Sequence, residues 1–339
     1  MTSPFGLGSL GDLPPPPPPR RRRGPLSGAL LAALVVVVLL VLVVAVRVVQ
    51  REVTDRRRVP PTITPTTVPE VPGTRTDAGS VLSACPTYTQ PFPLPPLTCT
   101  QLSPPNLRDG ERLPLVVLLH GFNTSPSQEI GSGGWDAAVV RRRFILAVPE
   151  SNAASWNAGG CCGLSQSLQI DDIARIRSLI RAMKQLPGID PARVFLVGNS
   201  NGGMMVYRFV CDNAGELAGA VSIEGTRVVS CTPKSPLRFL HVAGVDDMAV
   251  PYEGGQSLAA WVLGVSFSPV RASVDQYAEA QGCSPSNSST KGNVATQQWA
   301  CGDGVPLRLV SLQGWGHAWP TPSWYVATDE LLDFLGVDR

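Results

Sequence analysis

Histidine is scarce in this chain, with three residues among 339, and no Cys-x-x-Cys pair accompanies them. The sequence therefore gives no support for a metal site, which usually needs clustered histidine or cysteine ligands. A phosphate-binding loop and a dinucleotide-binding glycine fingerprint are also missing, so we expect no cofactor. The formal net charge is only +2, which is too small to indicate a nucleic-acid partner.

Charge is absent from one long segment near the N-terminus. Residues 26–46 carry no charged side chain and have arginines on both sides. A helix of this length spans about 30 Å, the thickness of a membrane's hydrocarbon core, so we expect a transmembrane anchor over residues 24–49. A cleaved signal peptide is the alternative, although its apolar region is usually about 7–15 residues long and ends in small residues. The arginines at 20–23 favour a cytoplasmic N-terminus, and those at 56–58 oppose it.

The segments on either side of this predicted anchor are rich in proline. Residues 1–23 are rich in proline and arginine, and we expect them to be disordered. Residues 50–80 contain many prolines and threonines, which favours a semi-extended linker. The remaining residues, 81–339, provide enough chain for one large domain with its own core.

All eight cysteines follow the apolar segment. They are Cys85, Cys99, Cys161, Cys162, Cys211, Cys231, Cys283 and Cys301. An even number of cysteines beyond a membrane segment indicates disulfides in an oxidising compartment. We therefore expect the domain to lie outside the cytoplasm, anchored to the membrane or secreted if the anchor is cleaved. Proximity in the sequence favours Cys85–Cys99 and Cys283–Cys301, whereas Cys161 and Cys162 either pair with Cys211 and Cys231 or bond to each other.

Short apolar segments alternate with helical patterns from about residue 113. The apolar segments lie at 115–119, 144–148, 194–197, 218–223, 237–242 and 307–312. Between them, residues 169–185 carry isoleucine, leucine and methionine at the spacing of one helix face. This alternation is typical of a mostly parallel sheet that is covered by helices on both faces. We therefore predict an α/β fold for the domain.

The sequence Gly-Asn-Ser-Asn-Gly-Gly at 198–203 follows one of these apolar segments and precedes a helical pattern. It fits Gly-x-Ser-x-Gly, in which a sharp turn between a strand and a helix exposes a nucleophilic serine. An ordinary surface turn is the alternative, but the position between a strand and a helix favours Ser200 as a nucleophile. The backbone N–H groups of Asn201, at the start of the helix, and of Phe122, in the loop after an earlier strand, are then candidates for an oxyanion hole.

A serine hydroxyl needs a general base to become nucleophilic, and the chain offers three histidines. His120 directly precedes the expected oxyanion loop, and His241 lies within an apolar segment, where we expect a core residue. His317 lies in a loop after the last strand and matches the chain order serine, acid, histidine of this motif. For the acid, Asp246 and Asp247 both follow a predicted strand, and their spacing alone does not separate them.

Six stretches of the sequence make a family resemblance specific. They are LLHG (118–121), WNAGGCCG (156–163), DDI (171–173), GNSNGGMM (198–205), VPYEGG (250–255) and GHAWP (316–320). With these motifs the chain resembles a secreted esterase family that includes polyhydroxybutyrate depolymerase-like and feruloyl esterase-like enzymes. The resemblance places the acid at Asp247, because the family motif G-x-x-D-x-x-V-P-Y fits Gly244 and residues 250–252. Ala243 departs from the family, which usually has a histidine there.

The resemblance also implies a fold and an activity. The fold is the α/β-hydrolase fold, and the activity is hydrolysis of carboxylic esters through a Ser-His-Asp triad and an acyl-enzyme, with no cofactor. The expected substrates are polymeric or carbohydrate-linked, such as feruloyl or acetyl esters of polysaccharides or polyhydroxyalkanoate, and cell-envelope lipids also remain open. Two other functions remain open at this stage, a surface-anchored binding module without catalysis and a serine peptidase on the same fold.

Several aromatic and acidic residues flank these motifs. The aromatic ones, which are candidates for substrate contact, are Trp156, Tyr252, Trp315 and Trp319. Their alternative role is structural, because tryptophan is readily buried wherever its N–H finds a partner. Asp171 and Asp172 open a predicted helix, where a carboxylate is more typical of capping than of catalysis.

Overall fold

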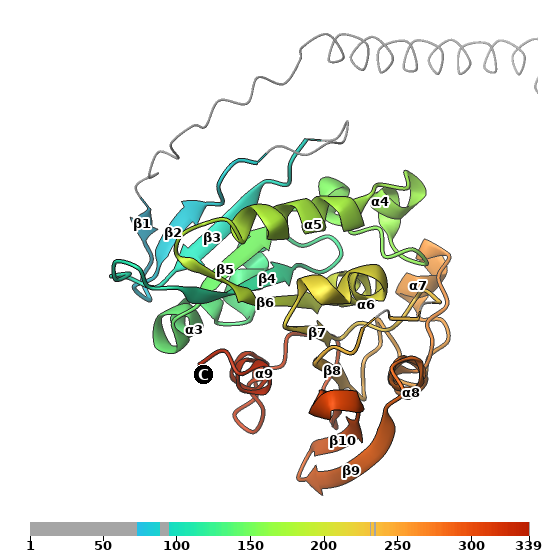
Figure 1. Ribbon diagram of the computed structural model, residues 1–339. Helices are drawn as coiled ribbons and strands as arrows, with labels where there is room; N and C mark the ends of the chain where they lie inside the picture. Colours follow the sequence, from blue (N-terminus) through green and yellow to red (C-terminus); the bar gives the residue numbers. More distant parts are fainter. Residues whose placement is uncertain (1–72, 89–94, 231, 234, 339) are drawn as a thin grey trace, which may run out of the picture. The chain divides into compact units, whose positions relative to one another are not determined.

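The structure, a computed structural model, describes residues 73–88, 95–230, 232–233 and 235–338 (Figure 1). The predicted anchor at 24–49, the predicted disordered segment at 1–23 and most of the predicted linker at 50–80 lie outside these residues. Within the described ranges, every helix is too short or too polar to span a bilayer.

Eleven strands of the described chain form one sheet, in the order β1-β2-β3-β5-β4-β6-β7-β8-β11-β10-β9. The parallel centre consists of β5 (Ile145–Pro149), β4 (Leu113–Leu119), β6 (Ile189–Asn199), β7 (Gly219–Ile223), β8 (Phe239–Gly244) and β11 (Pro306–Leu312). Antiparallel strands extend the two edges, β1 (Thr74–Arg75), β2 (Val81–Ala84) and β3 (Cys99–Ser103) on one side and β10 (Val294–Ala300) and β9 (Ser284–Lys291) on the other. All six predicted apolar segments fall on or overlap the parallel strands, so the mostly parallel sheet is confirmed.

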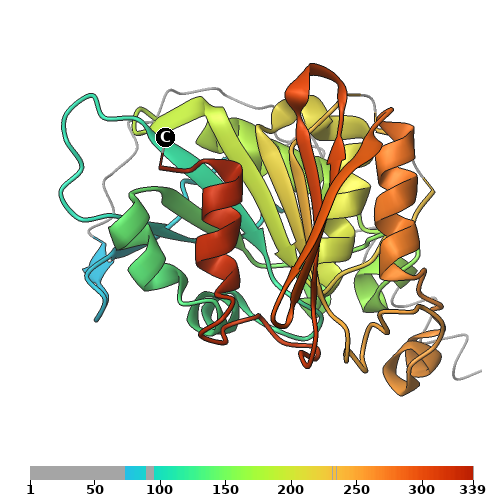
Figure 2. The same ribbon diagram turned by 90° about the horizontal axis from the view of Figure 1, so that it is seen from below.

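Helices cover both faces of the sheet, as its continuous apolar strands require. One face carries α5 (Asp172–Met183), α6 (Asn201–Asn213) and α8 (Val270–Ala280). The other carries α3 (Trp135–Arg142) and α9 (Ala327–Leu335), and Figure 2 shows α9 in front of the strands. Each face has its own core, with Ile180 and Tyr277 in the first and Trp135 and Leu331 in the second.

Shorter elements connect these layers. They are α2 (Pro126–Ser132), α4 (Gly163–Ser167), α7 (Leu258–Leu263) and the 3-10 helices η1 (Asn152–Ala154), η2 (Ala214–Glu216) and η3 (Gly302–Gly304). The predicted helical pattern at 169–185 corresponds to α5, whose first turn is capped by Asp171 accepting a hydrogen bond from the Ala174 N–H. The predicted capping role of Asp171 is therefore confirmed.

Three disulfides lie within the described residues, Cys85–Cys99, Cys161–Cys162 and Cys283–Cys301. The two pairs expected from proximity are confirmed. Of the two alternatives for Cys161 and Cys162, the bond between the adjacent residues is the correct one. Cys211 is also disulfide-bonded, and Cys231 lies outside the described residues. The bonded cysteines indicate that the domain matures in an oxidising compartment.

The parallel strands bring four polar side chains to one rim of the sheet. Ser200 follows β6, Glu224 follows β7, Asp247 lies in the loop after β8, and His317 lies in the loop after β11. In such sheets the carboxyl ends of the strands are where ligands bind. Residues that are far apart in the chain can therefore meet there.

Candidate active site

Ser200 occupies the turn between β6 and α6 in a conformation that is unusual for its residue type. Its backbone has φ 52° and ψ −118°, a strained conformation of the kind that clusters at functional sites. A Cβ atom on Gly198 would lie 2.2 Å from the Gly202 carbonyl oxygen, and one on Gly202 would lie 2.2 Å from the Leu119 carbonyl oxygen. The turn can therefore close only with glycine at these two positions. The Ser200 N–H donates to the Ile223 carbonyl at 2.8 Å, which ties the turn to β7.

A continuous chain of hydrogen bonds joins Ser200 to a carboxylate. His317 Nε2 lies 2.9 Å from Ser200 Oγ, and His317 Nδ1 lies 2.6 Å from Asp247 Oδ2. Asp247 Oδ1 accepts the backbone N–H groups of Ala249 and Val250 at 2.7 and 2.8 Å. Asp247 is buried whereas Asp246 is exposed. The structure thus brings together the three residues that the sequence predicts as nucleophile, base and acid.

The other two histidines have structural positions. His241 is fully buried in β8, its Nδ1 lies 2.8 Å from the Tyr207 hydroxyl, and burial lowers its pKa to about 3. His120 is also buried, and burial lowers the pKa of its ring. Its Nδ1 donates to the Gly121 carbonyl at 2.8 Å, and its Nε2 accepts the Ser151 N–H at 3.1 Å. A neutral His120 therefore fixes the start of the loop that contains Phe122.

This loop lies directly against the nucleophile. A Cβ atom on Gly121 would lie 3.4 Å from Ser200 Cβ. Among the described residues, no hydrogen bond uses the backbone N–H of Phe122 or that of Asn201. Asn201 begins α6, where free N–H groups and the helix dipole favour a negative charge. Both N–H groups remain available to a developing oxyanion.

A buried carboxyl group supports the same loop. Glu129, on α2, accepts the Gly121 N–H at 3.4 Å and the Asn199 side-chain N–H at 3.3 Å through Oε2. Its other oxygen, Oε1, has no partner among the described residues. Burial raises the pKa of Glu129 to about 7.

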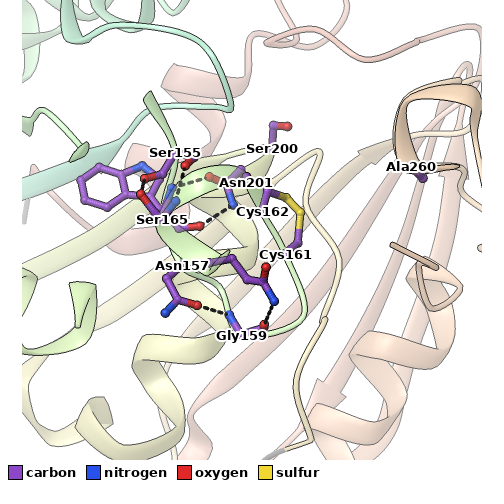
Figure 3. Close-up of a disulfide and its surroundings, with 12 residues drawn as sticks. Ser155, Asn157, Gly159, Cys161, Cys162, Ser165, Ser200, Asn201 and Ala260 are labelled. Atoms are coloured by element: carbon purple, nitrogen blue, oxygen red, sulfur yellow. Dashed lines mark hydrogen bonds between the residues drawn. A yellow bond between two sulfur atoms is a disulfide. The ribbon is translucent and has the colours of Figure 1, made fainter. Parts of the chain in front are cut away.

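Asn201 holds a second loop through its side chain. Its Oδ1 accepts the Trp156 N–H at 2.7 Å, and its Nδ2 donates to the Trp156 carbonyl at 3.0 Å. Figure 3 shows the Asn201 side chain in one close-up with Ser200 and the Cys161–Cys162 disulfide. Asp172 lies in the first turn of α5, where it was expected, and it also fixes the same loop by accepting the Asn157 N–H at 2.8 Å.

Two of the predicted substrate contacts are buried instead. Trp156 is 0% exposed and donates its indole N–H to the His120 carbonyl at 3.0 Å. Trp319 is 4% exposed, donates to Thr328 Oγ1 at 3.0 Å and packs against the ring of Trp135. Neither ring presents a surface to a ligand, so the expectation that they contact substrate is corrected to a structural role.

The other two predicted substrate contacts are half-buried. The Tyr252 hydroxyl lies 2.6 Å from Ser311 Oγ, and its side chain lines an open polar groove of about 490 Å³ with Glu253 and Arg271. Trp315 donates its indole N–H to the Ala318 carbonyl at 2.9 Å, and its ring packs edge-on against Trp324. These two aromatic residues remain candidates for substrate contact.

Glu224 also lies at this site, although it is not among the residues predicted from the sequence. It is 2% exposed, and its carboxyl oxygens accept the Gly244 N–H at 2.9 and 3.1 Å. Oxygen atoms of Glu224 and Asp247 and a ring nitrogen of His317 all lie within 4.8 Å of one another. In the described part of the chain this is the one grouping with the spacing of a metal site, but His317 and Asp247 are already hydrogen-bonded to each other.

Sequence relatives point to ester chemistry. The chain is 26% identical over 229 residues to feruloyl esterase B of Piromyces equi, covering 63% of this chain and 41% of the relative. It is 25% identical over 228 residues to the bifunctional acetylxylan esterase/xylanase XynS20E of Neocallimastix patriciarum, covering 64% and 30%. It is 24% identical over 230 residues to poly(3-hydroxyalkanoate) depolymerase C of Paucimonas lemoignei, covering 61% and 55%. The predicted resemblance is confirmed.

The chain spans less than half the length of the first two relatives. No family model matches it. Among solved structures, an acetyl xylan esterase from Aspergillus awamori aligns with a TM-score of 0.54 and 17% identity over 76% of this chain and 99% of that one. A putative dipeptidyl aminopeptidase IV from Bacteroides ovatus aligns with a TM-score of 0.51 and 11% identity over 76% and 36%. The chain has an α/β-hydrolase fold.

Proposed function

We propose that the domain is a serine carboxylic-ester hydrolase in which Ser200 is the nucleophile, His317 the base and Asp247 the acid. The observation that carries this proposal is the chain of hydrogen bonds from Ser200 Oγ through both ring nitrogens of His317 to Asp247, at 2.9 and 2.6 Å. Such a chain makes a serine hydroxyl reactive near neutral pH.

In the first half of the reaction, Ser200 Oγ attacks the ester carbonyl carbon while its proton passes to His317 Nε2. Asp247 accepts the Nδ1–H and stabilises the imidazolium that forms. The oxyanion accepts hydrogen bonds from the N–H groups of Phe122 and Asn201, and removal of one such donor typically costs about 3–4 kcal/mol. His317 then donates the proton to the alcohol oxygen as the ester C–O bond breaks, which leaves the acyl group on Ser200.

In the second half, a water molecule attacks the acyl-enzyme and gives a proton to His317. The tetrahedral intermediate forms in the same oxyanion hole. It collapses as His317 returns the proton to Ser200 Oγ, and the carboxylic acid leaves. No cofactor is needed at any step, since His317 moves every proton.

The substrate class follows from the relatives. The names of the relatives point to feruloyl esters, acetylated xylan and poly(3-hydroxyalkanoate). We infer a polymeric or carbohydrate-linked ester, and Tyr252 and Trp315 are the side chains most suited to contact it.

The same proposal includes the location of the enzyme. The disulfide bonds favour an extracytoplasmic domain. We retain residues 81–339 as the catalytic domain, within the compact unit Thr67–Arg339. We also retain the transmembrane anchor at 24–49, with a secreted protein as the alternative if the anchor is cleaved.

An ester panel tests this function. The full chain should hydrolyse p-nitrophenyl acetate and at least one of methyl ferulate, acetylated xylan and a polyhydroxyalkanoate film, and Ser200→Ala should lose this activity. Casein digestion without ester hydrolysis would favour a peptidase. A folded wild-type protein that cleaves neither substrate class would favour a non-catalytic binding module.

A further inference from the structure

Glu224 is a buried acidic residue at the carboxyl end of β7, and the triad mechanism does not use it. In the described part of the chain it is one of eight residues other than glycine with positive φ, at 49°. A side chain held in this backbone region at a strand end is more common at functional sites than elsewhere. The adjoining residues touch the nucleophile, because Ile223 accepts the Ser200 N–H and a Cβ on Gly225 would lie 2.7 Å from the Ser200 carbonyl oxygen.

The Glu224 side chain faces the catalytic acid. One carboxyl oxygen of Glu224, one of Asp247 and a ring nitrogen of His317 lie within 4.8 Å of one another. Its oxygens also accept the Gly244 N–H at the end of β8. Glu224 therefore holds the end of the strand that leads to Asp247, and its carboxyl group lies within 4.8 Å of the Asp247 carboxylate.

The buried carboxyl group of Glu224 favours its protonated form. Burial, and then the neighbouring charge of Asp247, raises the pKa of Glu224 well above its usual value. Asp247 already accepts hydrogen bonds from Ala249, Val250 and His317. Two carboxylates this close do not both ionise readily, and a protonated Glu224 can donate its O–H to Asp247 as a fourth donor.

We propose that Glu224 is a positioning residue of the triad, whose protonated carboxyl group donates a hydrogen bond to Asp247 and holds that carboxylate toward His317. The inference rests on the proposed function and extends it to a chain of four side chains, Ser200, His317, Asp247 and Glu224. Glu224 does not touch the reacting atoms and acts only through Asp247.

Two substitutions separate the donor role from side-chain size. Glu224→Gln keeps an N–H donor toward Asp247 and a carbonyl acceptor for Gly244. Glu224→Met places an unbranched side chain of similar length there, without the hydrogen-bond donor toward Asp247 and without the acceptor for Gly244. We expect kcat to fall about 10–100-fold in Glu224→Met, the range expected for a hydrogen bond to a charged group, with KM nearly unchanged. Glu224→Gln should stay within about threefold of wild type.

A double-mutant cycle tests whether Glu224 acts through Asp247. In an Asp247→Asn background, Glu224→Met should lower kcat by less than about threefold. The residual rate of this background is measured against that of Ser200→Ala. An equal loss in both backgrounds, or a loss in Glu224→Gln as large as that in Glu224→Met, would overturn the proposal. Thermal melts confirm that each variant is folded, and Glu224→Ala replaces Glu224→Met if the latter does not fold.

NMR of the His317 ring tests the same positioning role without substrate turnover. The chain has three histidines, so the His317 ring can be assigned by ¹⁵N-edited NMR of the full chain against His317→Gln. The proton on His317 Nδ1 should move upfield in Glu224→Met and stay near its wild-type position in Glu224→Gln. Unchanged resonances in both variants would refute the positioning role. Absence of ester hydrolysis in the wild type would instead count against the proposed function.

Discussion

The two asparagines beside Ser200 each hold one wall of the candidate site. Asn199 contacts Glu129, which in turn accepts the Gly121 N–H of the oxyanion loop. Asn201 clamps the backbone of Trp156 with two hydrogen bonds. The residues that flank the nucleophile therefore fix the loops around it, and polar side chains are needed there for a structural reason.

Asp247 and its neighbour Asp246 form a matched pair for testing the acid. Asp247→Asn leaves the size of the side chain unchanged but disturbs the tautomer of His317, so kcat for p-nitrophenyl acetate should fall about 10⁴-fold. Asp246→Asn alters an exposed carboxylate one residue away and should leave kcat within about twofold. Equal rates for the two variants would contradict the assignment of the acid.

The raised pKa of Glu129 predicts that its contribution to the stability of the folded protein depends on pH. Its pKa in the folded protein is about 7, above the usual value of 4.5, so the folded state binds the proton more tightly than the unfolded chain. Stability is therefore lost as the pH rises from about 4.5 through 7, by on the order of 1–3 kcal/mol. Glu129→Gln keeps the acceptor for the Gly121 N–H and cannot ionise.

Thermal melts at several pH values check this prediction. The Tm of Glu129→Gln should rise relative to wild type between about pH 4.5 and pH 7 and then stay at a constant offset. A Tm difference that does not vary over this range would mean that Glu129 titrates near its usual value.

At the scale of elements, the turn from β6 to α6 depends on close backbone contact. Gly198→Ala places a Cβ 2.2 Å from the Gly202 carbonyl oxygen, so α6 must shift. We expect a loss of about 2–4 kcal/mol, seen as a Tm decrease of roughly 5–15 °C. The control is Gly215→Ala, where nothing lies within 4 Å of the added Cβ, and its Tm should stay within about 2 °C. Similar melts for the two variants would contradict this geometry.

The parallel strands could be predicted from the sequence because burial on both faces leaves continuous apolar segments. The strands β9 and β10 could not, because β9 is exposed along its whole length and consists mostly of serine and other polar residues. The hairpin that they form is specified by backbone pairing with β11 and not by an apolar pattern.

The site was predictable because its reactive side chains follow the parallel strands, Ser200 directly after β6 and Asp247 and His317 in the loops after β8 and β11. The motif order indicated Ser200 and His317, and the family resemblance selected Asp247 over Asp246. No sequence pattern indicated Glu129 as a site residue, because its contact with Gly121 depends on how α2 packs. A pattern was present for Glu224, which is an acidic residue immediately after the apolar segment at 218–223. The sequence left the roles of Trp156 and Trp319 open, because a motif does not reveal which of its aromatic residues is buried.

For the whole molecule, the Cys283–Cys301 disulfide restrains the edge of the sheet. It closes a separation of 18 residues around β9 and β10, and its removal should cost about 3 kcal/mol. The double variant Cys283→Ser/Cys301→Ser should therefore melt roughly 6–12 °C lower by calorimetry. Cys161→Ser/Cys162→Ser opens no loop between distant residues and should change Tm much less. A larger loss from the second variant would show that loop closure is not the main contribution.

Covalent labelling of Ser200 is the most direct test of the central claim, that His317 and Asp247 activate this serine. The full chain is treated with a fluorophosphonate probe at neutral pH, and the modified residue is located by peptide mass spectrometry. We predict stoichiometric labelling at Ser200, labelling slowed at least about 100-fold in His317→Ala, and none in Ser200→Ala. A folded wild-type protein that stays unlabelled, or that carries the label on another residue, would contradict the account.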